Sequence, residues 1–258
     1  MNSSNWADNT SPSLGQAIAE DPIVVVPVGS IEQHGNHLPV GTDGFAVEAV
    51  ARRAVESWQG RRKVFLLPTL WTGLSPHHMN LPGTITLRSE TFISVLEDIC
   101  ISLLHHGVRR ILLLNGHGGN ISAMDVALAR LGERKLETER VVALTYWHLV
   151  ASRAAEMRES RVGGTGHAGE FETSLMLATQ PDQVKLDEAQ VAYPELPSGY
   201  LSTDLFEGAP ARRYIPFDKL SSSGTFGDPS LATLEKGERI LRVCSEELLA
   251  FLHDFQAW

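Results

Sequence analysis

The chain has few cysteines and few basic residues, and it lacks any long apolar run. Only Cys100 and Cys244 occur among its 258 residues, far apart, so we expect a cytoplasmic protein without a disulfide scaffold. Lys and Arg number 22 against 31 Asp and Glu, for a formal net charge of −9, and no basic cluster suits nucleic acid. No apolar run approaches the roughly 20 residues of a membrane span. The sequence therefore argues against nucleic-acid and membrane partners.

Length and composition indicate one folded domain. Apolar residues make up 43% and charged residues 21% of the chain, close to the average for globular proteins. A chain of this length can bury one sizeable core. The polar residues 1–20 are expected to form a flexible segment. Residues 21–258 are expected to form a single domain.

Short apolar runs alternate with helical patterns along this domain. Continuous β-branched and leucine runs predict strands over residues 23–28, 63–68, 110–115 and 140–147. Helical spacing of apolar residues predicts helices over residues 46–58, 89–103, 124–131, 170–179 and 231–255. This alternation is typical of an α/β fold with a mostly parallel central sheet. Ligands of such sheets bind at the carboxyl ends of the strands, so the loops that follow the strands are the first candidates for a site.

The loop after the first predicted strand is rich in potential metal ligands. Within about a dozen residues it contains Glu32, His34, His37 and Asp43, separated by glycine and proline. Carboxylate oxygens and imidazole nitrogens together suit Zn, Mn or Fe. If the stretch is extended, Glu32 and His34 point the same way, because alternate residues share a face. The alternative is a polar loop in which Asp43 caps the following helix.

Two further loops place a histidine between glycines. His117 follows the third predicted strand, and His167 precedes the carboxylates Glu170 and Glu172 at the start of a helix. A glycine-rich turn at a helix start can also bind phosphate. The alternative from another class is therefore a non-catalytic nucleotide- or phosphate-binding module. Neither the dinucleotide fingerprint nor the P-loop pattern is complete, however, and the carboxylates of the first loop would repel a phosphate.

Together the three loops supply carboxylates and imidazoles for more than one metal ion. One carboxylate can bridge two cations about 3.5–4 Å apart, as in two-metal hydrolytic sites. The chain has neither a G-x-S-x-G nucleophile elbow nor an H-E-x-x-H zinc motif. This combination favours a metal-dependent hydrolase.

Four blocks of the sequence resemble the signatures of the creatininase (creatinine amidohydrolase) family. They are residues 29–43, 75–87, 115–120 and 167–174, in the order found in that family. The first and third blocks are the most specific. The resemblance implies a three-layer α/β/α sandwich, a dinuclear metal centre and hydrolysis of C–N bonds in small, often cyclic, amides.

Carried over by position, the resemblance implies two divalent metal ions per subunit, which could be Zn, Mn or Fe. One metal would lie on Glu32 and His117, the other on His34, with Asp43 between them. The full set of protein ligands that it implies is Glu32, His34, Asp43, His117 and Glu172.

The chain departs from creatininase at Gly119, where creatininase carries a glutamate. This argues against creatinine as the substrate and leaves Glu172 to complete the site, with Glu170 as the second choice. The expected mechanism is attack of a hydroxide, activated by both metals, on the amide carbonyl. His167 would carry the proton to the leaving nitrogen, and Glu170 is the alternative proton carrier.

Another group of residues is expected to bind the substrate. Ser75, His77 and His78 should form one wall of the pocket, although the two histidines could instead cap a helix or lie at an interface. Trp147 should form a second, flat wall that suits a small planar amide. Gly118, next to His117, is expected beside them.

The same metal centre could also support a lactonase, a formamide hydrolase or a short-peptide amidase. The sequence does not choose between these substrates.

Residues 194–227 carry many aromatic side chains without helical or strand periodicity, which is typical of an interface or a lid. We therefore expect a homo-oligomer, and the resemblance favours a hexamer.

Overall fold

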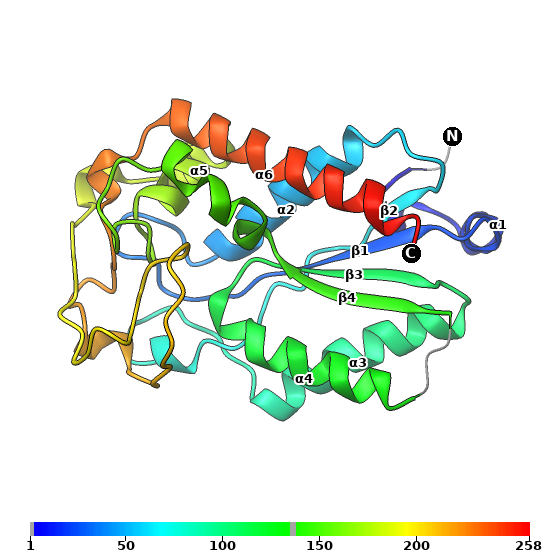
Figure 1. The fold of residues 1–258 in the computed structure, drawn as a ribbon, viewed down its shortest axis with the longest axis horizontal. Coiled ribbons are helices and arrows are strands. Elements are labelled where there is room, and N and C mark those ends of the chain that lie inside the picture. Colours follow the sequence, from blue (N-terminus) through cyan, green and yellow to red (C-terminus); the bar gives the residue numbers. More distant parts are fainter. Residues whose placement is uncertain (1–2, 135–137) are drawn as a thin grey trace.

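The computed structural model, which describes residues 3–134 and 138–258, is built on a parallel sheet of four strands in the order β2-β1-β3-β4 (Figure 1). In register, Val28 pairs with Asn115, and Asn115 pairs with Thr145, so the carboxyl ends of three strands are level. The strands are β1 (Ile23–Val28), β2 (Val64–Leu66), β3 (Arg110–Asn115) and β4 (Arg140–Thr145).

Helices cover both faces of this sheet and make a three-layer α/β/α sandwich, which confirms the predicted fold class (Figure 1). Every residue of β1 and β3 is buried, as their continuous apolar sequences require. One face is covered by α2 (Thr42–Glu56), α5 (Glu170–Thr179) and α6 (Leu234–Phe255). The other is covered by α1 (Ser11–Ala19), α3 (Ser89–His105) and α4 (Ile121–Gly132).

The boundaries of several elements differ from the sequence prediction. Helix α2 begins four residues earlier than expected, so Asp43 lies in its first turn, where a carboxylate is favoured by the helix dipole. The strand predicted to reach residue 147 ends at Thr145, and a 3-10 helix follows over Tyr146–Glu156. Tyr146 and Trp147 are both buried. Two consecutive side chains turned into one core do not fit the alternation of a strand.

Residues 3–20 are packed against the sheet, which differs from the flexible segment expected from their composition. The rings of Trp6 and Phe65 are nearly perpendicular, with centroids 5.7 Å apart, and Leu66 donates a backbone hydrogen bond to Ser4. Ala17, in helix α1, is fully buried in the core below the sheet. Apolar side chains at these positions dock a segment that is polar on average.

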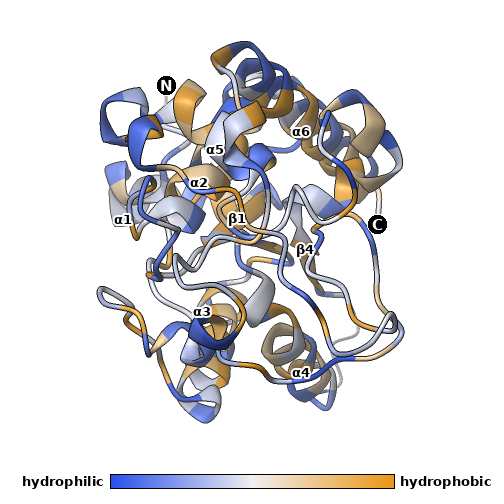
Figure 2. Cartoon of the chain, turned by 90° about the vertical axis from the view of Figure 1, so that its left-hand side faces the viewer, coloured by the Kyte–Doolittle hydropathy of each residue, from blue (hydrophilic) through white to orange (hydrophobic). Residues whose placement is uncertain are grey.

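The loops that follow β1, β3 and β4 emerge at one end of the sheet, on the left of Figure 1 and toward the viewer in Figure 2. The long irregular stretch between α5 and α6, coloured yellow to orange, lies over the same end. Within the described residues, no helix combines the length and apolarity needed to cross a membrane.

Candidate metal centre

The five expected metal ligands converge at this end of the sheet, and all five are buried. Glu32 and His34 lie in the loop after β1, and His117 lies in the turn after β3. Asp43 and Glu172 lie in the first turns of α2 and α5. Level strand ends and two helix starts thus bring residues that are up to 140 positions apart in the sequence into one cluster.

Asp43 lies between two imidazoles. Its Oδ1 atom is 3.3 Å from His34 Nε2, and its Oδ2 atom is 3.1 Å from His117 Nδ1. Such a carboxylate is placed to contact one cation through each oxygen.

The other two carboxylates extend the cluster on either side. Glu32 Oε2 lies 3.3 Å from His117 Nε2, and Glu172 Oε2 lies 3.9 Å from His34 Nε2. The set His34, Asp43 and Glu172 therefore offers three ligand atoms within 4.8 Å of one another. Two further sets share Glu32, the first with His77 and His117 and the second with His34 and His167.

Backbone carbonyls orient both imidazoles that face Asp43. His34 Nδ1 lies 3.2 Å from the carbonyl of Glu32, and His117 Nε2 lies 2.9 Å from the carbonyl of Leu74. If each of these nitrogens donates its N–H, the remaining nitrogens, His34 Nε2 and His117 Nδ1, keep a lone pair directed at Asp43. Metal-binding histidines are held by this kind of outer hydrogen bond.

The buried carboxylates of the cluster favour the binding of cations. Glu32, Asp43 and Glu172 are buried, and among the described residues only histidines form ion pairs with them. Burial, together with the charges of Asp43 and Glu32, raises the pKa of Glu172 to about 7. Burial lowers the pKa of His34, but Asp43, Glu172 and Glu32 together outweigh it and raise the pKa to about 9. His34 Nε2 and Asp43 Oδ2 also lack a hydrogen-bond partner among the described residues. Buried carboxylates facing open imidazole nitrogens fit divalent metal ions.

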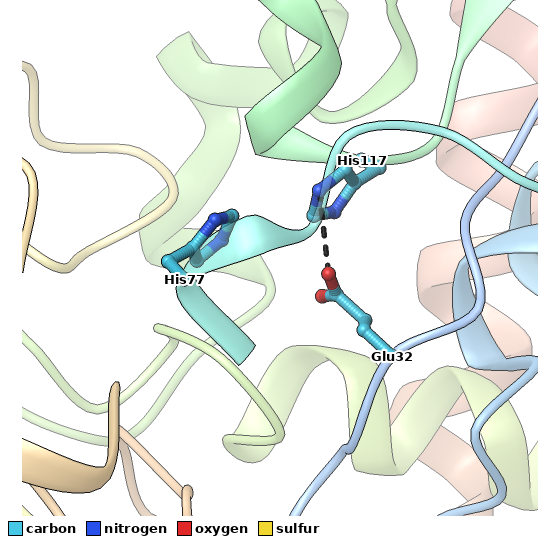
Figure 3. A group of neighbouring side chains, drawn as sticks. All are labelled: Glu32, His77 and His117. Carbon is cyan, nitrogen blue, oxygen red and sulfur yellow. Dashed lines mark ion pairs between the residues drawn. The ribbon is translucent and has the colours of Figure 1, made fainter. Parts of the chain in front are cut away.

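Three more histidines surround this cluster. Figure 3 shows His77 on its short turn beside Glu32 and His117, and the His77 and His117 rings are stacked with centroids 5.8 Å apart. His78 Nε2 lies 3.4 Å from Glu32 Oε2, and His167 Nδ1 lies 3.5 Å from Glu32 Oε1. His77 and His167, expected to bind substrate and to carry protons, are therefore also within reach of a metal.

Gln33 connects two of these histidines, and sequence reasoning did not single it out. Its side-chain amide lies 2.8 Å from His78 Nδ1 and 3.1 Å from His167 Nε2, while its backbone carbonyl is 2.6 Å from His167 Nε2. With His167 Nε2 donating to that carbonyl, Nδ1 is left facing Glu32. The position of Gln33 between two metal ligands in the sequence is the signal that could have found it.

A cavity of about 440 Å³ opens onto the cluster, and it contains most of the expected substrate-binding residues. His77, His78, Gly118 and Trp147 line it. Ser75 does not; it is fully buried behind Glu32, and its hydroxyl donates a 2.5 Å hydrogen bond to Glu32 Oε2. Ser75 is therefore placed to orient Glu32.

Glu170 is not brought to the cluster. Its carboxylate is fully buried on the other side of the α5 N-terminus. There it accepts hydrogen bonds from the backbone N–H groups of Glu159 and Ser160 and pairs with Lys236 Nζ at 2.5 Å. With its oxygens held in this way, Glu170 has no free position from which to bind a metal or carry a proton in the cavity.

Residues 194–227, the covering segment, form the outer wall of the cavity. The ring of Phe217 lies 4.1 Å from that of His78 and 4.2 Å from that of Phe226, measured between centroids. Tyr214 donates a hydrogen bond of 3.1 Å to the carbonyl of Pro76. Some of the aromatic residues predicted to lie at an interface or a lid thus pack beside the candidate metal ligands within the same chain.

Comparison with known proteins identifies the family of the chain. A family model described as creatinine amidohydrolase matches residues 7–252. The creatinine amidohydrolase of Pseudomonas putida is 35% identical, and the match covers 88% of this chain and 86% of that protein. The mycofactocin precursor peptide peptidase of Mycolicibacterium smegmatis (strain ATCC 700084 / mc(2)155) is 33% identical, with coverages of 85% and 79%.

Solved structures are similar over almost the whole chain. The structure named "Creatininase Mn" has a TM-score of 0.81 and 31% identity, and the match covers 98% of both chains. A mutant creatininase of the Zn-Zn type has a TM-score of 0.80 and 31% identity, with the same coverage.

Proposed function

The chain belongs to the creatininase family of metal-dependent amidohydrolases, and from this premise we propose that it hydrolyses the C–N bond of a small amide at a centre of two divalent metal ions. The observation that carries the proposal is the position of Asp43, with one oxygen toward His34 and the other toward His117. This family membership also sets aside the non-catalytic phosphate-binding module.

In this proposal Glu32 and His117 would hold one ion and His34 and Glu172 the other, with Asp43 available to both. Bound at these residues, the ions would polarise the amide carbonyl and lower the pKa of the attacking water. Relatives are solved with manganese and with zinc, and a set of three carboxylates and two imidazoles suits either metal, as well as iron.

His167 is the proposed proton carrier of the reaction. Its Nε2 atom is fixed on the Gln33 carbonyl, so its Nδ1 atom faces the cavity side of the cluster, 3.5 Å from Glu32 Oε1. Burial lowers the pKa of His167 well below its ordinary value. The imidazole is then neutral and can accept a proton at Nδ1 before passing it to the leaving nitrogen.

The cavity supports a substrate of limited size. Its volume of about 440 Å³ lies in the range for small-molecule sites. Trp147 contributes a flat aromatic surface to the lining, which also contains His77 and His78. The substrates to be assayed are therefore cyclic amides, formamides, short peptides and lactones.

Metal content and activity together test the proposal. The protein is stripped with a chelator, reloaded with Zn, Mn or Fe, and assayed against that panel. We expect about two ions per chain and amide hydrolysis that depends on them. Asp43→Asn should lose at least one ion and nearly all activity, whereas Asp98→Asn, an exposed change on α3, should keep both. Full activity without metal, or full metal content in Asp43→Asn, would contradict the proposed centre.

Assembly and location are further parts of the proposal. We infer a homo-oligomer, with a hexamer favoured by the family resemblance. Tyr200 and Tyr214 of the covering segment are 69% and 64% exposed, which supports burial of this surface against another subunit. A cytoplasmic location agrees with two free, buried cysteines, Cys100 and Cys244.

A further inference from the structure

The charged side chains that line the cavity fall into two groups of opposite character. The floor carries the carboxylates and imidazoles of the metal cluster. The only other charged groups in the lining, within the described parts of the chain, are Arg212 and Arg213 of the covering segment. The rest of the lining is mainly apolar, aromatic or small, with the hydroxyls of Ser202 and Thr203.

Neither arginine forms an ion pair with an acidic side chain among the described residues. Arg212 donates one hydrogen bond, 3.4 Å long, to the neutral hydroxyl of Ser122 on α4, and Arg213 has no ion pair or hydrogen bond with any other described residue. The positive charge of Arg212 is felt at His148, whose pKa is lowered first by burial and then by this charge. Both side chains are exposed, so within the described residues the pair is free to bind an anion.

The neighbouring contacts keep this part of the chain at the cavity. Tyr214, next in sequence, is hydrogen-bonded to the turn that carries His77 and His78, and Phe217 packs on the same turn. The side chain of Arg212 contacts Ser122 at the start of α4, which follows the turn that carries His117. The arginines are therefore held beside the opening of the cavity by contacts on both sides.

Resting on the proposed function, we propose that Arg212 and Arg213 select amide substrates that carry a free carboxylate. The amide group would lie at the metal cluster, and the carboxylate would be bound by one or both guanidinium groups at the other end of the cavity. A guanidinium binds a carboxylate through two parallel, charge-assisted hydrogen bonds, which few other side chains can match. The substrate class is thus a small amide with an acid group, such as a carboxylated lactam or a peptide with a free C-terminus.

Matched substrate pairs test the inference on the metal-loaded enzyme. The pairs are 5-oxoproline with 2-pyrrolidinone, dihydroorotate with dihydrouracil, and a dipeptide with its C-terminal N-methylamide. The members of each pair share the scissile bond and differ in the carboxylate. We expect the acid member of at least one pair to have a kcat/KM about 10-fold to 100-fold higher, mainly through KM, as charge-assisted hydrogen bonds predict.

Variants then assign this preference to the arginines. Arg212→Met combined with Arg213→Met should lower the ratio of acid to neutral kcat/KM at least tenfold. Lys219→Met removes a positive charge from the same segment but from outside the cavity lining, where Lys219 pairs with Asp218 at 3.4 Å. This control should leave the ratio within about twofold of the original.

Binding of a non-hydrolysable pair separates this inference from the proposed function. By calorimetry, 3-oxocyclopentane-1-carboxylate should bind more tightly than cyclopentanone, and the double variant should abolish the difference. Neutral amides hydrolysed as well as acidic ones, with a ratio unchanged by the double variant, would overturn the inference and leave the proposed function standing. Arginine-dependent binding of the acid without hydrolysis of any amide would support anion recognition but overturn the proposed function. Absence of both hydrolysis and selective binding would overturn both.

Discussion

Lys236 forms a buried ion pair with Glu170 close to the candidate metal ligands, and we expect its loss to lower the stability of the fold. Its Nζ atom lies 2.5 Å from Glu170 Oε1, 2.6 Å from the carbonyl of Leu231 and 3.2 Å from Glu159 Oε1. Lys236 is only 8% exposed, and Glu170 is fully buried. The pair joins the first turn of α6 to the first turn of α5, two residues before Glu172.

We predict that Lys236→Met lowers the free energy of unfolding by about 3 kcal/mol. Removing one partner of a buried ion pair costs about 3–5 kcal/mol, because the other charge is left uncompensated. The lower end applies because Glu170 keeps its hydrogen bonds from the backbone of residues 159 and 160. At about 2–4 °C per kcal/mol for a chain near this size, Tm should fall by about 6–12 °C.

Two comparison variants make the result specific to the buried charge. Lys185→Met removes a lysine that pairs with Glu188 at the surface and should cost at most about 1 kcal/mol. Lys236→Met combined with Glu170→Gln removes both charges, so it should be more stable than Lys236→Met alone. Urea denaturation of the metal-free proteins measures all three, and a loss in Lys236→Met no larger than in Lys185→Met would refute the reasoning.

The pH dependence gives a second readout. Burial raises the pKa of Glu170, but the bonds from Lys236 and the backbone lower it more, so the net pKa lies below the ordinary value of 4.5. A lowered carboxyl pKa stabilises the fold above pH 4.5, and this contribution is lost as pH falls through the folded-state pKa. The stability difference between the original protein and Lys236→Met should therefore shrink below pH 4.5. A difference that stays constant to lower pH would show that the charge on Glu170 is not its cause.

Three other predictions concern the site and the assembly. Gly119→Ala would place a methyl group against the His117 ring and should lose metal, measured by elemental analysis, whereas Gly118→Ala meets no atom within 4 Å and should retain it. His167→Ala should lower kcat by about 10²–10⁴ with metal content unchanged; a parallel loss of metal would assign His167 to the ligands instead. Sedimentation at micromolar concentration should give an oligomer, and a monomer would reject a subunit contact by the covering segment.

The layered fold was predictable because its signals are local. Continuous β-branched runs such as residues 23–28 have few alternatives to a strand buried on both faces. The ends of elements were less predictable, since they depend on contacts across the fold. Tyr146 is an example: it leaves the strand pattern to lie beside Phe171, with ring centroids 6.2 Å apart. The docking of residues 3–20 likewise depends on the packing of Trp6 against Phe65, a contact distant in the sequence.

The cluster of candidate metal ligands could be anticipated because its residues lie in short blocks at strand ends and helix starts. The roles of nearby residues could not be read in the same way. Glu170 and Glu172 look equivalent in the sequence, yet successive side chains of a helix diverge, and these two lie on opposite sides of the α5 N-terminus. Nothing in the pattern of α6 distinguishes Lys236 from an exposed lysine, so the partner that holds Glu170 was not predictable.

Different parts of the chain form the candidate metal-binding floor of the cavity and the outer wall that would contact the substrate. The floor lies at the ends of paired strands and at helix starts, where Glu32 is hydrogen-bonded to Ser75 and His117 to the carbonyl of Leu74. The outer wall is an irregular segment whose side chains can change without disturbing the sheet. Relatives named as a creatinine amidohydrolase and as a peptide peptidase belong to the same family as this chain. This is expected if similar catalytic sites are combined with different substrate-binding segments. Substitutions in residues 194–227 should therefore alter KM and substrate range more than metal content, and those in the strand-end loops should do the reverse.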